Sequence, residues 1–183
     1  CSSDLVSPQS NYLKTMSTIK VAVAGVGFIG PAHIEALRRN PNIEVVSIFH
    51  PVPGEAELKA EQLGIPKAYL SYDDLIADES VQVVHVCTPN NLHFEQAKKA
   101  LLAGKHVVCE KPLATSIAEA EELVELAAKT GLVNAVHFNL RYYPIVRQMK
   151  VMREKGELGE LYSIIGSYLQ DWLFHQTDYN WRL

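Results

Sequence analysis

The segment IKVAVAGVGFIGPAHIEALRRN, residues 19–40, decides the fold. It opens with an apolar run at 19–24 that is too short for a helix and has the Val-rich composition of a buried parallel strand. The motif Gly25-Val26-Gly27-Phe28-Ile29-Gly30 follows at once and leads into a helical pattern that extends through Arg39. A Gly-x-Gly-x-x-Gly motif alone is weak evidence, but a strand before it and a helix after it supply the context that it needs.

Each glycine of this motif has its own expected role. Gly25 permits a tight turn, Gly27 lets a pyrophosphate approach the backbone, and Gly30 lets the helix pack on the strand. The helix directs its N-terminal amides and the positive end of its dipole at that phosphate. The alternative is a glycine-rich turn without a ligand. We expect a dinucleotide site formed by Gly25, Val26, Gly27, Phe28, Ile29 and Gly30.

The rest of the chain to about residue 138 repeats the same alternation. Short runs rich in Val and Ile are separated by amphipathic helical segments, of which one begins at the capping box Ser116–Glu119 and ends at Gly131. Strict alternation implies right-handed crossovers and a parallel sheet covered on both faces. The sequence therefore predicts a Rossmann-type, doubly wound α/β domain over 16–138. Its expected strands lie at 19–24, 44–49, 67–70, 81–87, 105–109 and 132–138.

The two ends of the chain differ from this pattern. Residues 1–15 are polar and aperiodic, which indicates a disordered or vector-derived tail, although Cys1 leaves a lipidated N-terminus open. From 139 to 183 we expect the truncated start of an α+β second domain, with a helix at 143–155 and one long strand at 160–172. Because no partner for that strand is left in the chain, we expect its sheet to be encoded downstream.

Composition narrows the class of protein. Hydrophobic residues make up 48% and charged residues 21% of the 183 residues, the net charge is -4, and no basic run suits nucleic acid. No apolar run reaches the roughly 18 residues of a membrane span. Cys87 and Cys109 end apolar runs, as buried free thiols do, which favours a cytoplasmic protein.

The sequence departs from the usual dinucleotide-binding pattern at the position that contacts the cofactor ribose. An acidic residue is expected at the end of the second strand, about 20 residues after the glycines. Phe49, His50 and Pro51 occupy that place, and the next carboxylate is Glu55. His50 could face a ribose hydroxyl or a 2′-phosphate, or lie in a surface loop without a ligand. The choice between NAD and NADP stays open.

Three further segments resemble the glucose-fructose oxidoreductase / inositol dehydrogenase family, often called Gfo/Idh/MocA. They are CTPNNLH at 87–93, EKPLA at 110–114 and NLRY at 139–142, in the order and spacing of that family. The EKP segment is the most specific of these motifs, and the glycine motif is the least. The resemblance extends from about residue 19 to residue 183.

The resemblance implies roles for residues after three strands. Lys111 is the implied catalytic residue, as a general acid or base or as a charged hydrogen-bond donor to the substrate oxygen, and a solvated surface lysine is the alternative. Glu110 would pair with Lys111 or contact a ribose. The other implied cofactor contacts are Thr88, Pro89, Asn90, His93, Asn139 and Arg141; local hydrogen bonding, turn formation or domain packing are the alternatives.

In that family an Asp and a His on a later helix, in a Gly-Asp-Ile-Gly-Ser-His-like stretch, complete the catalytic site. No such stretch occurs in this sequence. We therefore expect this chain to bind NAD or NADP but to turn over substrate poorly. The expected reaction of the whole protein is hydride transfer between nicotinamide and a CH–OH/C=O centre of a sugar, cyclitol or similar polyol. We also expect a homo-oligomer formed through the C-terminal sheet. A non-catalytic dinucleotide sensor or partner-binding module is the competing hypothesis.

Overall fold

The computed structural model describes residues 18–171 and 173–179 and divides into two units, one ending at Phe138 and the other starting at Asn139. The predicted tail at 1–15 lies outside the described residues, as do Trp172, Trp181 and Arg182.

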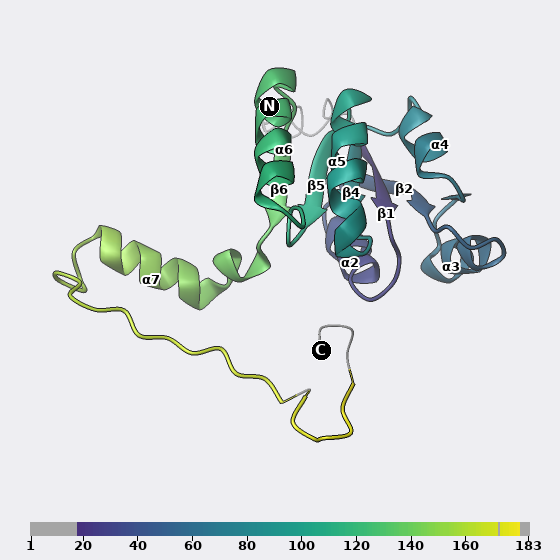
Figure 1. The fold of residues 1–183 in the computed structure, drawn as a ribbon. Coiled ribbons are helices and arrows are strands. Elements are labelled where there is room, and N and C mark those ends of the chain that lie inside the picture. The colour runs from purple at the N-terminus through teal and green to yellow at the C-terminus, as the bar shows by residue number, and fades with distance from the viewer. Residues whose placement is uncertain (1–17, 172, 180–183) are drawn as a thin grey trace, which may run out of the picture. The chain divides into compact units, whose positions relative to one another are not determined.

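The first unit is built on one parallel sheet of six strands (Figure 1). The strand order is β3-β2-β1-β4-β5-β6, so the chain moves outward from β1 in one direction and then returns to the other side of β1. This reversal confirms the doubly wound fold, and it places the carboxyl ends of β1 and β4 at a topological switch point. The strands are β1 (Ile19–Ala24), β2 (Ile43–Phe49), β3 (Lys67–Tyr69), β4 (Val83–Val86), β5 (His106–Glu110) and β6 (Asn134–His137).

Helices cover both faces of this sheet, and each face has its own core. On one face Leu75, Ala97 and Leu123 from the helices pack against strand residues such as Val84. On the other face Ile34 and Ala60 pack against Val23, Val45 and Ile48. Figure 1 shows α5 and α6 side by side on the first face. The helices are α2 (Gly30–Arg38), α3 (Glu55–Leu63), α4 (Tyr72–Ala77), η1 (Asn90–Leu92), α5 (His93–Leu102) and α6 (Ile117–Thr130).

The helix ends follow the signals in the sequence. The Ser116 hydroxyl accepts a hydrogen bond from the Glu119 amide, and the Glu119 carboxylate accepts one from the Ser116 amide, which completes the capping box of α6. Gly131 ends this helix with φ 65°, a left-handed conformation that favours glycine. The predicted helical boundary is therefore confirmed.

The second unit consists of η2 (Asn139–Tyr142), α7 (Pro144–Glu154) and an extended segment. The predicted strand at 160–172 is wrong over 160–171, where no β-ladder forms and large side chains such as Ile164 and Ile165 are exposed. The physical reason is the absence of a neighbouring strand in the described part of this unit, because an extended backbone becomes a β-strand only when its amides and carbonyls pair.

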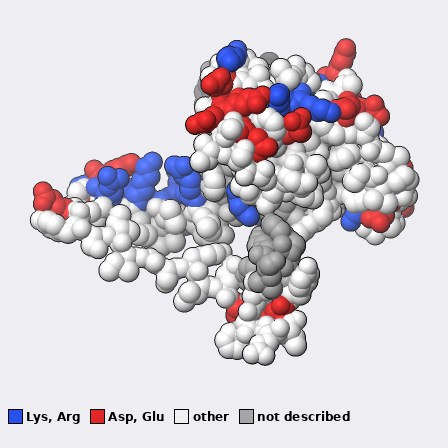
Figure 2. Space-filling model, in the orientation of Figure 1, with Lys and Arg blue, Asp and Glu red and all other residues white. Residues whose placement is uncertain are grey.

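Charged side chains of both signs gather mainly along the upper part of the visible face of the first unit, and basic side chains follow α7 (Figure 2). No helix among the described residues is both long and apolar enough to cross a membrane. Cys87 and Cys109 are buried free thiols, as the sequence predicts.

Candidate functional site

Two glycines of the loop after β1 are required by the surrounding backbone. Gly25 has φ 89°, and a Cβ there would lie 2.7 Å from the carbonyl of Cys87 and the amide of Thr88. A Cβ on Gly30 would overlap the carbonyl oxygen of Gly25. Gly25 therefore makes the predicted tight turn, while Gly30 allows the helix to pack against the loop's own first residue rather than against the strand.

Gly27 is free of such constraints. A Cβ at Gly27 would meet no atom within 4 Å, so the space over this residue is open. Within the described part of the chain, the amides of Gly27, Phe28 and Ile29 donate to no protein acceptor. The first turn of α2 holds no acidic residue. An open surface with unpaired amides at a helix start fits a pyrophosphate, and so this loop meets the requirement for a dinucleotide.

The side chains of this loop differ in their exposure. Val26 is 2% exposed and belongs to the core, so only its backbone can contact a ligand. Phe28 is 98% exposed at the tip of the loop. The predicted contacts of the loop are therefore contacts of backbone groups, with Phe28 as the one large side chain free to cover a ligand.

At the end of β2, His50 pairs with a carboxylate. The Nε2 atom of His50 lies 3.7 Å from the Glu55 carboxylate, and its Nδ1 accepts a hydrogen bond from the Val52 amide. Glu55 is exposed in the first turn of α3. A carboxylate therefore lies next to His50, although it comes a few residues after the strand end.

The loop after β4 turns its threonine inward. The Thr88 hydroxyl is buried and donates to the side-chain oxygen of Gln96 at 2.6 Å, and the Gln96 carbonyl accepts from Tyr72. Burial raises the pKa of Tyr72, so its hydroxyl remains a donor. Pro89 is exposed and Asn90 is half-buried at the start of η1, which leaves these two available to a ligand.

His93 is buried beneath this loop, away from any surface that a cofactor could reach. Its side chain is 1% exposed, its Nε2 lies 2.8 Å from the Thr88 carbonyl, and its Nδ1 lies 2.6 Å from the Pro112 carbonyl. The expectation of a direct cofactor contact is therefore corrected. His93 instead ties the loop after β4 to the loop after β5.

The loop after β5 carries Lys111. The Lys111–Pro112 peptide bond is cis, and the Lys111 side chain is exposed. The expected ion pair between Glu110 and Lys111 does not form. The Glu110 carboxylate is buried and contacts Lys111 only through the Lys111 amide, which donates to Oε2 at 3.2 Å.

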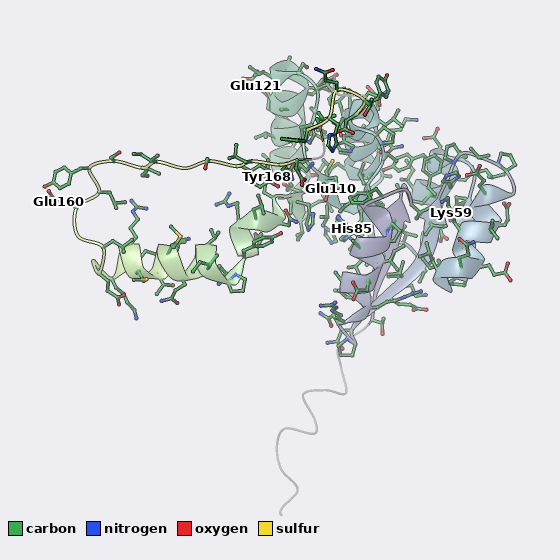
Figure 3. All side chains as sticks on the ribbon, turned by 90° about the horizontal axis from the view of Figure 1, so that it is seen from below. Lys59, His85, Glu110, Glu121, Glu160 and Tyr168 are labelled. Carbon is green, nitrogen blue, oxygen red and sulfur yellow. The ribbon has the colours of Figure 1, made fainter. Side chains whose placement is uncertain are left out.

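The other oxygen of Glu110 belongs to a cluster of three histidines. His33 Nε2 lies 2.9 Å from Oε1, and His137 Nδ1 lies 2.5 Å from the same atom. His33 Nδ1 lies 2.8 Å from His85 Nδ1. The cluster therefore joins α2, β4, β5 and β6; Figure 3 labels two of its members, His85 and Glu110.

Burial and hydrogen bonding set the charges in this cluster. Burial alone would raise the pKa of Glu110, but hydrogen bonds from His33 and His137 outweigh it, and the pKa is lowered. Burial lowers the pKa of His33 despite its hydrogen bond with Glu110. Burial, together with the neighbouring His33 and His137, lowers the pKa of His85 to about 4. At neutral pH the Glu110 carboxylate thus contacts a neutral His33, which in turn contacts a neutral His85.

His33, Glu110 and His137 also present atoms of the kind that bind metals, all within 4.8 Å of one another. A tetrahedral zinc ion with bonds of about 2 Å separates its ligand atoms by roughly 3.3 Å. The two contacts to Oε1, at 2.9 and 2.5 Å, are shorter than that. The arrangement therefore fits charge-assisted hydrogen bonds better than a metal ion.

In the second unit, Asn139 and Arg141 lie in η2. Arg141 and Tyr142 line a surface hollow together with Val146, Arg147 and Lys150 of α7. These residues provide basic and aromatic groups on one surface of that unit.

Sequence reasoning missed four residues that hold the site: His33, His85, Gln96 and His137. On β5 and β6, Glu110 and His137 are register partners, so they share a face. For His85 and His137 the available signal was a polar residue inside a strand, because a buried strand rarely carries one without a partner. His33 and Gln96 lie in α2 and α5, where no such signal exists.

Comparison with known protein families and sequences agrees with a dinucleotide-binding fold. A family model described as "Oxidoreductase family, NAD-binding Rossmann fold" matches residues 19–138. Levoglucosan dehydrogenase of Pseudarthrobacter phenanthrenivorans is 35% identical over 170 residues, which is 86% of this chain and 42% of that protein. Inositol 2-dehydrogenase/D-chiro-inositol 3-dehydrogenase of Lactiplantibacillus plantarum is 38% identical over 145 residues, covering 77% of this chain and 41% of that protein.

Comparison with solved structures also gives oxidoreductases of the same fold. An NAD-binding oxidoreductase from Klebsiella pneumoniae superposes with a TM-score of 0.76 at 34% identity, covering 79% of this chain and 40% of the other. A scyllo-inositol dehydrogenase from Lactobacillus casei, with bound NAD(H) and scyllo-inositol, gives a TM-score of 0.74 at 26% identity over 79% of this chain and 43% of the other. The chain therefore spans about two-fifths of the length of the relatives it matches.

Proposed function

Because the chain belongs to the Gfo/Idh/MocA oxidoreductase family, we propose that it is the dinucleotide-binding part of a dehydrogenase acting on a sugar, cyclitol or similar polyol. Residues 16–138 would form the cofactor domain, and 139–183 would begin the substrate domain. The observation that carries the proposal is the open loop at Gly27, with its unpaired amides at the start of α2.

The chain's own groups would divide the work of binding. The amides of Gly27, Phe28 and Ile29 would hold the pyrophosphate. Pro89 and Asn90 would line the nicotinamide end, because ligands of doubly wound folds lie outside the carboxyl ends of the strands. When bound, the cofactor supplies a hydride donor or acceptor, and the protein supplies position and charge.

Lys111 would act on the oxygen side of the reaction. Its ammonium group can donate a hydrogen bond to the substrate oxygen, and its amine form can accept the hydroxyl proton during oxidation. Its side chain is exposed in the structure. Desolvation would therefore begin when substrate and cofactor cover it.

His50 and Glu55 bear on the choice between NAD and NADP. A carboxylate at this place accepts hydrogen bonds from a ribose 2′-OH and repels a 2′-phosphate. Glu55 lies beside His50, and the family model is NAD-binding. We propose NAD as the preferred cofactor.

Titration of NADH and NADPH against the purified chain, followed by nicotinamide fluorescence, tests the proposal. We expect NADH to bind, and Gly27→Val to abolish binding without loss of stability, since its Cβ would meet no protein atom. Gly166→Val is the matched control, because that glycine also has open space and lies in the second unit. Equal affinity of the Gly27→Val variant and the parent chain would overturn the phosphate site.

Turnover separates the proposal from its alternative, a dinucleotide sensor or partner-binding module. We expect this chain to bind cofactor and to oxidise polyols poorly, because the Asp and His of the family's later helix are absent from it. A protein that contains this chain together with a complete substrate domain should reduce NAD with a polyol. Binding without turnover in that longer protein would favour the module.

A further inference from the structure

We propose that His33 is a positioning residue that acts through Glu110 on the backbone of Lys111, and so connects the phosphate-binding helix to the catalytic lysine. The inference rests on the proposed function for the role of Lys111. The contacts themselves do not depend on it.

One carboxylate makes both contacts. Oε1 of Glu110 accepts from His33 Nε2 at 2.9 Å, and Oε2 accepts from the Lys111 amide at 3.2 Å. The two oxygens belong to one rigid plane, so a movement of His33 that turns the carboxylate also changes the contact with the Lys111 amide. The Glu110 side chain is 8% exposed, so the packing of its neighbours limits how far it can turn independently.

The protons of this network have only one consistent arrangement. An ionised Glu110 only accepts hydrogen bonds, so His33 must place its proton on Nε2. Because burial lowers the pKa of His33 and leaves it neutral, its Nδ1 is an acceptor, and His85 Nδ1 must be the donor. His137 Nδ1 donates to the same Oε1 from β6. The carboxylate is therefore held by His137 of β6 and by His33 of α2, which in turn contacts His85 of β4.

The position of His33 in the chain connects this hydrogen-bond network to the start of α2. His33 lies in the first turn of α2, three residues after Gly30, and its side chain is 3% exposed. The same turn follows the amides that are proposed to hold the pyrophosphate. A small adjustment of α2 on phosphate binding would move Nε2, then the carboxylate, and then the Lys111 amide.

ADP is a suitable probe, because it fills the phosphate end of a dinucleotide site and has no nicotinamide with which to touch Lys111. Amide resonances of the ¹⁵N-labelled chain report on both ends, Gly27 on binding and Lys111 on transmission. In the parent chain we expect ADP to shift both resonances. In His33→Leu we expect ADP to shift Gly27 alone, and in His33→Gln, whose amide nitrogen replaces Nε2, we expect the Lys111 response to return.

The state without ligand is tested on the same samples. In His33→Leu we expect the Lys111 amide to exchange with solvent about tenfold faster, as the loss of one charged hydrogen bond implies. His106→Gln is the matched control, because His106 lies at the other end of β5 and contacts Val133 instead. If His33→Leu does not fold, His33→Asn replaces it, since its shorter amide does not reach Glu110.

The outcomes separate the two proposals. An unchanged Lys111 amide in the His33 variants, or an equal ADP response with and without His33, overturns the positioning role. Absence of any Gly27 shift with ADP overturns the phosphate site instead, while the exchange measurement still decides whether His33 holds the Lys111 backbone.

Discussion

The loops after β1 and β5 lie at the same edge of the sheet, but different forces hold them in place. The loop after β1 is shaped by backbone sterics, since Gly25 and Gly30 occupy places where any Cβ would collide. The loop after β5 is held by side chains from three separate elements, α2, β5 and β6, that meet at Glu110. The first arrangement is local in sequence and the second is not. The two loops should therefore respond differently to substitution, pH and ligand.

The largest effect should come from the sterically fixed loop. We expect Gly30→Ala to destabilise the fold by about 4 kcal/mol or to prevent folding, because its Cβ would overlap the Gly25 carbonyl. Gly27→Ala is the control and should change the free energy of unfolding by less than about 1 kcal/mol. Urea unfolding of both variants makes the comparison. Similar stabilities would show that the backbone contact at Gly30 relaxes easily.

The next effect concerns the side-chain network. Replacing Glu110 by Ala leaves donors on His33, His137 and Lys111 without an acceptor. We expect a loss of about 3 kcal/mol in the free energy of unfolding, as for other buried charged partners. Glu121→Ala on the exposed side of α6 should cost less than about 0.5 kcal/mol. A small loss for Glu110→Ala would mean that water satisfies the donors.

The network should also make stability depend on pH. His85 has a pKa of about 4 in the folded chain against 6.5 when unfolded, so the unfolded chain binds more protons between these values. Stability from this group is present above pH 6.5 and is lost as the pH falls toward 4. The difference of about 2.5 pH units between the two pKa values corresponds to about 3 kcal/mol. The His85→Asn variant should lose less stability between pH 7 and 4.5 than the parent chain, whereas His175→Asn should match the parent.

The contrast between the loops also explains what the sequence could predict. The tight turn at Gly25, the six strands and the caps at Ser116 and Gly131 depend on residues close together in the chain, and the structure confirms them. The partners of Glu110 come from positions 33 and 137, which no local pattern connects. His93 was placed on the cofactor because its motif adjoins the cleft, but its ring is turned to two backbone carbonyls. The predicted strand is wrong over the described residues 160–171, because strand propensity does not supply a partner strand.

The smallest effect on stability should accompany the largest proposed effect on chemistry. Lys111→Ala removes an exposed side chain, so we expect the free energy of unfolding to change by less than about 0.5 kcal/mol. NADH affinity should stay within about threefold, since the phosphate contacts lie in the other loop. In a protein that adds the substrate domain, kcat should fall by roughly 100-fold or more, as for loss of a general acid or base. Lys59→Ala on α3 should leave kcat unchanged. An undiminished kcat for Lys111→Ala would remove this lysine from the mechanism and leave the loop after β5 with a structural role alone.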